Sequence, residues 1–109
     1  MASNCGTVAL TSSTGAKSFN IGMTANWCQV RIRGSGLQAS EGFVYGGDQY
    51  CYSDPTTGLP VNKAIQVKNT AGTVVIEGTW TSFSGSNVNF NITTNTTGAT
   101  QSVLLVFGN

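Results

Sequence analysis

The sequence predicts an all-β protein, an antiparallel β-sandwich of eight or nine short strands. Apolar and polar residues alternate with a period of two along most of the chain, and clusters of turn-forming residues recur about every 8–12 residues. No stretch shows the i, i+3, i+4, i+7 spacing of an amphipathic helix. This pattern is typical of a sandwich or a barrel. Since 109 residues correspond to one domain, we expect a single sandwich domain over residues 1–109.

In the first half of the chain the expected strands are short and separated by polar turns. The third strand is the most clearly two-sided, because Cys28, Val30 and Ile32 form an apolar face while Arg31 and Arg33 form a small cationic row on the other. The fourth and fifth strands are joined by a glycine-rich hairpin turn. We expect these strands over residues 7–11, 17–21, 28–33, 42–45 and 49–52.

The second half is more regular. Residues 69–72 indicate a hairpin turn, and residues 78–83 either continue the preceding strand past a glycine bulge or begin a new strand. Residues 102–107 are apolar on both faces, which suits a central strand covered on both sides. The segment 53–60 has turn-forming residues throughout and is expected to be an ordered surface loop. Here we expect strands over residues 64–68, 73–77, 88–93 and 102–107.

The composition excludes several functional classes. Only 8% of the residues are charged and the net charge is +1, without a basic run, so neither nucleic acid nor an anionic membrane surface is an expected partner. No apolar stretch is long enough for a transmembrane helix. Glycine, serine, threonine and asparagine make up nearly half of the chain and give a neutral surface of hydroxyl and amide groups. The absence of histidine excludes Ser-His-Asp and Cys-His catalysis and every histidine-containing zinc site.

The chain has three cysteines, Cys5, Cys28 and Cys51, and the sequence does not determine whether they are free or form disulfides. They contain no C-x-x-C pair, and three thiolates without histidine do not complete an ordinary structural zinc site, so no metal and no cofactor is expected. They could be buried free thiols, one disulfide with one free thiol, or partners in an interchain bond. The polar residues at the N-terminus lack the apolar region of a signal peptide. We therefore expect either a chain not exported by that route or a domain of a longer protein.

The four carboxylates, Glu41, Asp48, Asp54 and Glu77, give no reason to expect an enzyme. A glycosidase needs two converging carboxylates, and nothing in this spacing brings two together. Solvated side chains are the expected state. A weak calcium site made by Asp48, Asp54 and loop carbonyls is the alternative.

The tyrosines indicate a ligand site. Three of them lie within eight residues, beside carboxylate and amide side chains, and this combination offers neutral sugars a flat apolar surface together with hydrogen-bonding groups. The alternative is that the tyrosines cover the edge of the sandwich core. Trp27 and Trp80 are expected in the core or at a subunit interface. The candidate ligand-binding residues are Tyr45, Asp48, Gln49, Tyr50, Tyr52 and Arg33.

Residues 17–32 resemble the opening of small jelly-roll domains at the tips of phage tail fibres and bacterial trimeric adhesive fibres. In those domains a polar-Phe-x-hydrophobic-Gly-Phe/Met-Thr-Pro stretch precedes a strand that ends in Arg or Lys. The matching residues run from Phe19 through Gly22 and Met23 to Thr24, with Ala25 where proline is usual. The final segment, residues 103–109, is also similar to the last strand of such tips.

This resemblance implies a jelly-roll-like sandwich that assembles as a homotrimer and binds its ligand at distal loops or subunit clefts. We therefore expect a non-enzymatic fibre-tip or adhesin domain that recognises a cell-surface glycan and works outside the cell or on a virion surface. One alternative is a monomeric carbohydrate-binding module. The other is a purely structural virion or fibre-assembly domain that binds only virion proteins.

Overall fold

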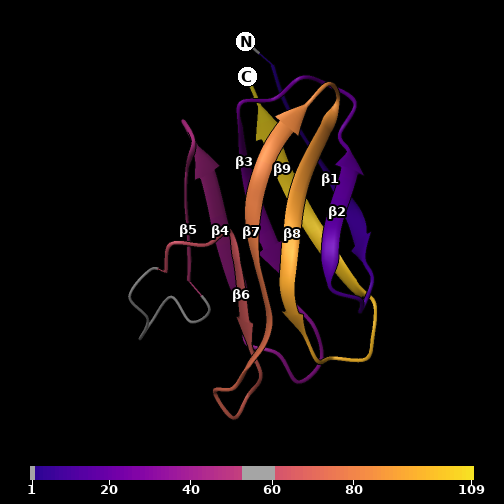
Figure 1. Ribbon diagram of the computed structural model, residues 1–109, viewed down its shortest axis with the longest axis vertical. Helices are drawn as coiled ribbons and strands as arrows, with labels where there is room; N and C mark the ends of the chain where they lie inside the picture. The colour runs from indigo at the N-terminus through magenta and orange to yellow at the C-terminus, as the bar shows by residue number, and fades with distance from the viewer. Residues whose placement is uncertain (1, 53–60) are drawn as a thin grey trace.

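The computed structural model describes residues 2–52 and 61–109, and these residues form a β-sandwich of two antiparallel sheets (Figure 1). In their spatial order, the strands of the five-stranded sheet are β1 (Ser3–Leu10), β9 (Gln101–Gly108), β3 (Trp27–Ile32), β4 (Ser40–Tyr45) and β5 (Asp48–Tyr52). Those of the four-stranded sheet are β2 (Gly15–Asn20), β8 (Asn87–Asn95), β7 (Val74–Ser84) and β6 (Ile65–Lys68). The predicted fold class is confirmed.

No helix is present in the described parts of the chain, and accordingly none there is long and apolar enough to cross a membrane. The loop expected at residues 53–60 lies outside the described residues, as does Asp54.

The chain wraps in a jelly-roll-like manner at its two ends. β1 pairs with β9 while β2 pairs with β8, so the first two strands lie against the last two as a ribbon that crosses from one sheet to the other. The middle of the chain departs from a jelly roll, because β3-β4-β5 and β6-β7-β8 are two meanders of sequential neighbours. The termini meet at one end of the sandwich, where the Asn109 amide donates to the Ala2 carbonyl at 3.0 Å.

The inward faces of both sheets form one core. Alternation along β3, β8 and β9 places apolar residues inside at every second position, as the sequence predicted. The largest fully buried side chains are those of Phe90, Leu10, Ile32, Ile76, Ile92 and Leu105.

β7 shows that residues 78–83 continue the preceding strand and do not begin a new one. It is one continuous strand, and its register against β8 shifts at Glu77/Gly78 and again between Trp80 and Ser82. The first shift is at the expected glycine. A Cβ built on Gly78 would lie 2.9 Å from the Asn91 carbonyl oxygen, so no larger residue fits against β8 there.

The outer faces of the two sheets differ in chemistry. On the four-stranded sheet, β8 presents Asn89, Asn91 and Thr93 outward, a surface of amides and hydroxyls. On the five-stranded sheet, Leu104 and Val106 of β9 remain partly exposed. β9 is an interior strand, between β1 and β3, but the described residues cover it fully on its inner side only.

Candidate functional site

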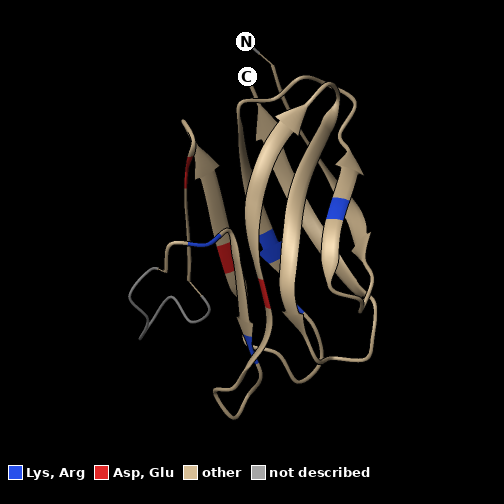
Figure 2. Ribbon diagram, viewed as in Figure 1, with Lys and Arg blue, Asp and Glu red and all other residues tan. Residues whose placement is uncertain are grey.

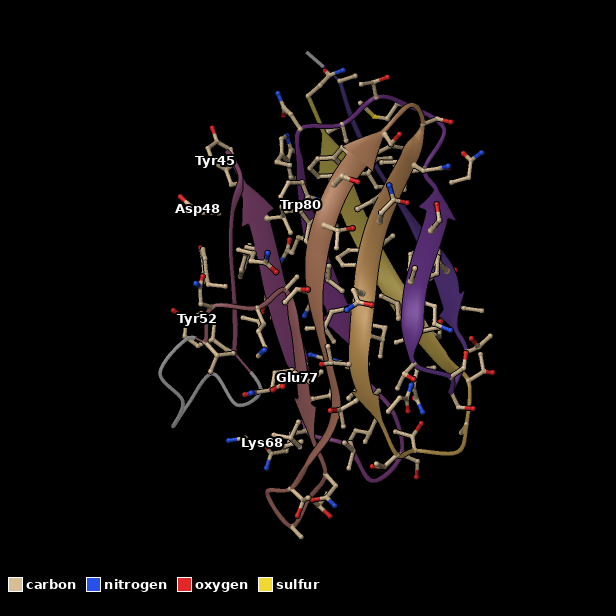
Figure 3. All side chains as sticks on the ribbon, viewed as in Figure 1. Tyr45, Asp48, Tyr52, Lys68, Glu77 and Trp80 are labelled. Carbon is tan, nitrogen blue, oxygen red and sulfur yellow. The ribbon has the colours of Figure 1, made fainter. Side chains whose placement is uncertain are left out.

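The β4–β5 hairpin places most of the predicted site residues on the outer face of the five-stranded sheet. Its turn, Gly46-Gly47, has φ angles of +59° and +87°, which glycine adopts without strain. A two-residue turn pairs Tyr45 with Asp48 and Phe43 with Tyr50, so alternate residues of both strands share one face. Figure 3 shows Tyr45 and Asp48 together near the turn, with Tyr52 farther along β5.

The aromatic rings on this face contact one another. The rings of Phe43 and Tyr50 are stacked, with centroids 5.1 Å apart and an angle of 23° between their planes. Tyr52 meets Tyr50 edge-on at 6.2 Å and 89°. Tyr45 is 73% exposed and Tyr50 42% exposed, whereas large hydrophobic side chains elsewhere among the described residues are largely covered. The rings therefore form a surface held in place by the sheet and open to solvent.

β3 extends this surface with Trp27, which lies across from Tyr45. A Cβ built on Gly108 of β9 would be only 2.6 Å from the Trp27 ring, so the indole lies directly over the glycine backbone. Residue 108 must therefore be glycine for the ring to lie flat here. We call Trp27, Phe43, Tyr45, Tyr50 and Tyr52 the aromatic face.

Polar groups accompany the aromatic face. Gln29 of β3 donates a hydrogen bond from Nε2 to Oε1 of Glu41. Glu41 is paired with Arg31 on one side and with Tyr52 on the other. Asp48 is exposed beside Tyr45. Hydrogen-bond acceptors and donors thus lie on the same face of the sheet as the rings.

Gln49 lies apart from this group, although it is adjacent to Tyr50 in sequence. Strand alternation turns its side chain toward the inside, where Oε1 accepts from the Trp80 amide at 2.8 Å and Nε2 donates to the Trp80 carbonyl at 3.1 Å. Both polar atoms are used within the fold, so Gln49 is a structural residue and is not part of the aromatic face.

Arg33 is also separate from the tyrosines. It follows the end of β3 and, with Arg31, lines a shallow depression of about 380 Å³ that also contacts Thr7, Ser102 and Leu104. This depression lies over β1, β9 and β3, at the other side of the sheet from β5. The structure therefore divides the six predicted site residues into the exposed hairpin group, the inward-facing Gln49 and the distant Arg33.

The carboxylates occupy different places in the fold. Glu77 of β7 lies in the four-stranded sheet, where it pairs with Lys63 at 3.6 Å and accepts from Gln66 Nε2 at 2.8 Å. Glu41 lies in the other sheet. Among the described residues no three His, Cys, Asp or Glu side chains come together as metal ligands. The calcium alternative needed Asp54, whose position is not described.

The three cysteines are all free thiols. Cys5 is exposed on β1, while Cys28 and Cys51 are buried. Burial raises the pKa of Cys28 to about 12. Burial, together with the charge of Glu77, raises the pKa of Cys51 to about 11. Both buried cysteines therefore act as small apolar residues at neutral pH, the first of the three states left open by the sequence, whereas the exposed Cys5 departs from it.

Phe43 and Trp27 were missed as site residues. The signal was present for Phe43, because counting outward from a two-residue Gly-Gly turn pairs it with Tyr50. Placing Trp27 beside Tyr45 requires the register between β3 and β4. The length of the loop between these two strands does not determine that register.

Comparison of the chain with protein-family models, curated proteins and solved structures finds no match.

Proposed function

We propose that this protein is a non-catalytic recognition domain that binds a cell-surface glycan on the aromatic face. The observation that carries the proposal is the set of contacting, solvent-open rings on one sheet face, centred on the Phe43–Tyr50 stack. Sugar rings pack their apolar faces on such surfaces, and their hydroxyls bond to side chains like those of Asp48 and Glu41. Because the rings are fixed by a sheet, little ordering cost opposes binding.

The contrast between the two outer faces supports the choice of this face. A water-facing surface of a sandwich is expected to resemble the amide and hydroxyl surface of β8. Five aromatic residues on the solvated side of one sheet, three of them with their rings in contact, are unexpected there and typical of a contact surface.

The fibre-tip architecture belongs to the same proposal. In it, the domain works as a homotrimer outside the cell or on a virion. The partly exposed Val106 of β9, next to β1, offers an apolar side chain for subunit contact that is separate from the β4–β5 hairpin. Light scattering after size exclusion tests this part, since a trimer has three times the 11.3 kDa mass of the chain. A monomer that still binds glycan would favour the carbohydrate-binding module.

The glycan proposal is tested with an array of bacterial and host glycans, followed by calorimetry on the glycans that bind. Tyr50→Ala should weaken binding about tenfold, since an aromatic stack is worth on the order of 1 kcal/mol. Tyr50→Phe keeps the ring and should retain most of the affinity. Asn91→Ala, exposed on the opposite sheet, is the matched control and should bind as the unchanged protein does. An array that stays silent, or a Tyr50→Ala variant with full affinity, would count against the proposal and favour the structural virion role.

A further inference from the structure

Arg31 and Arg33 stand at one end of β3 and share two hollows of the surface. The larger is the depression of about 380 Å³, which they line together with Thr7, Ser102 and Leu104. A smaller one, of about 60 Å³, lies on the other side of the same arginines, against Ala39, Ser40 and Glu41. The two guanidinium groups therefore stand between two concave regions of the outer face.

No carboxylate of the described residues forms an ion pair with either arginine, although Glu41 lies across from Arg31 and lines the smaller hollow with it. Within residues 2–52 and 61–109 the one ion pair is Lys63–Glu77, and no carboxylate oxygen lies within 4.0 Å of either arginine. Glu41, the residue paired with Arg31 across the strands, accepts its hydrogen bond from Gln29 instead. Figure 2 shows how few charged residues the two sheets carry. Two of the five cationic residues of the chain thus share one depression, and neither forms an ion pair with a described residue.

The chemistry of the depression suits an anion attached to a sugar. A guanidinium group binds a carboxylate or a sulfate through two parallel N–H···O bonds. The hydroxyls of Thr7 and Ser102 can bond to sugar hydroxyls, and Leu104 gives the ring an apolar surface. The volume of about 380 Å³ falls within the range of small-ligand sites.

The depression opens on the same side of the five-stranded sheet as the aromatic face, and one row of paired residues leads from one to the other. The strand registers place one residue from each of the five strands in a single row: Thr7, Leu104, Arg31, Glu41 and Tyr52. With about 4.8 Å between neighbouring strands, Leu104 and Tyr52 are roughly 14 Å apart. An oligosaccharide stacked on the tyrosines can therefore place an acidic substituent between the arginines.

We infer that the Arg31–Arg33 depression is a subsite for the anionic group, carboxylate or sulfate, of an acidic glycan. This inference rests on the proposed function for the rest of the ligand. It also makes a local claim that can be tested without knowing the whole glycan.

The test is an NMR titration of the native protein with D-glucuronate, glucose 6-sulfate and methyl glucoside as separate probes. We expect saturable shifts at the Arg31 and Arg33 side-chain Nε–H signals and at the Thr7 and Ser102 amides with one or both acidic sugars, and none with methyl glucoside. The sugar that binds tells a carboxylate site from a sulfate site. Shifts absent from the depression, or spread equally over all lysines and arginines, would overturn the inference. So would inorganic sulfate binding as tightly as glucose 6-sulfate, because the sugar would then contribute nothing.

Variants sharpen the test. Arg33→Gln should weaken the binding of the acidic sugar by about threefold to tenfold. Arg33→Lys should recover little of this loss, because lysine lacks the planar guanidinium group that donates two parallel hydrogen bonds. Lys68→Gln removes the same charge at the end of β6 and should change nothing. Equal affinity of Arg33→Gln and the unchanged protein would overturn the inference. Since Arg33 is exposed, its variants are expected to fold. A silent glycan array with intact shifts at the arginines would count against the aromatic face alone, so the two proposals fail separately.

Discussion

Gln49 and Trp80 join the two sheets through a pair of hydrogen bonds. The Trp80 amide donates to Gln49 Oε1 at 2.8 Å and Gln49 Nε2 donates to the Trp80 carbonyl at 3.1 Å. β6 stops pairing with β7 at Gly78, so no strand lies beside Trp80 on that edge of β7 in the part of the chain described. The Gln49 amide takes the place of the missing strand and satisfies both backbone groups.

Gln49→Met should destabilise the fold by about 2–3 kcal/mol, because it keeps the side-chain volume but leaves the Trp80 N–H and C=O without partners. Urea unfolding followed by tryptophan fluorescence measures this. Gln101→Met is the matched control, since the Gln101 side chain makes no hydrogen bond to the described residues, and it should change stability by less than about 0.5 kcal/mol. Equal effects of the two substitutions would show that the two hydrogen bonds between Gln49 and the Trp80 backbone contribute nothing to stability.

Gly42 of β4 is the tightest point between the sheets. A Cβ built there would lie 1.8 Å from the Ala64 carbonyl oxygen and 3.3 Å from Cys51 Cβ. Because the obstructing atom is backbone, Gly42→Ala should cost about 3 kcal/mol or more, in the upper range for overpacking. Gly6→Ala on β1, where a Cβ meets nothing within 4 Å, should be neutral or slightly stabilising. Thermal unfolding of both variants compares them, and a Gly42→Ala melting temperature within a degree or two of the unchanged protein would contradict the close contact.

The strand limits could be predicted from the sequence where apolar and polar residues alternate clearly. They could not be predicted where a segment is extended only because it pairs with a distant strand. β8 and β9 were expected within two residues of their limits, because their apolar residues alternate or run continuously. β1 begins four residues earlier than the expected residue 7. Its first residues are polar and show no useful pattern, and they are extended because Ser3 and Asn4 pair with the end of β9. Such pairing depends on residues about a hundred positions away.

Local sequence signals placed most candidate residues of the hairpin on one face of the sheet, but they did not place residues beyond the hairpin. The tyrosines were expected to form a ligand surface, and the structure places them together on an open sheet face. Gln49 was assigned to the site because it is next to Tyr50 in sequence. Alternation along a strand already predicts that these two side chains point to opposite faces of the sheet. The position of Arg33 relative to the tyrosines followed from strand order, which a single sequence does not reveal.

The thiols should divide sharply in reactivity. At pH 8, Ellman's reagent should modify one thiol per native chain quickly, Cys5, and three after unfolding in urea. Burial keeps Cys28 and Cys51 protonated and out of reach, because their pKa values are raised to about 12 and about 11. In Cys5→Ser no fast reaction should remain. Three fast thiols in the native chain would mean that the core opens readily, and none would mean that another chain covers Cys5.

The same burial predicts a loss of stability at alkaline pH. The pKa of Cys28 is raised from 9.0 to about 12 in the folded chain. Below pH 9 the thiol is neutral in both states, and its contribution to stability is fully present. Between pH 9 and 12 the unfolded chain releases this proton while the folded chain retains it, so the free energy of unfolding falls as the pH rises. At pH 10.5 the Cys28 contribution to this loss should be about 2 kcal/mol.

The measurement is urea unfolding of Cys28→Ala and of the unchanged protein at pH 8 and pH 10.5. At pH 8 the variant should be less stable, because it leaves a small cavity. At pH 10.5 this difference should shrink by about 2 kcal/mol or change sign, because the variant lacks the Cys28 thiol, while the buried Cys51 thiol is common to both proteins and cancels in the comparison. Val30→Ala, on the same face of β3, is the control: its own cost should be equal at both pH values, because valine does not ionise and every other group is common to the two proteins. A Cys28→Ala difference that stays constant between the two pH values would show that the thiol ionises as easily inside the sandwich as in the unfolded chain.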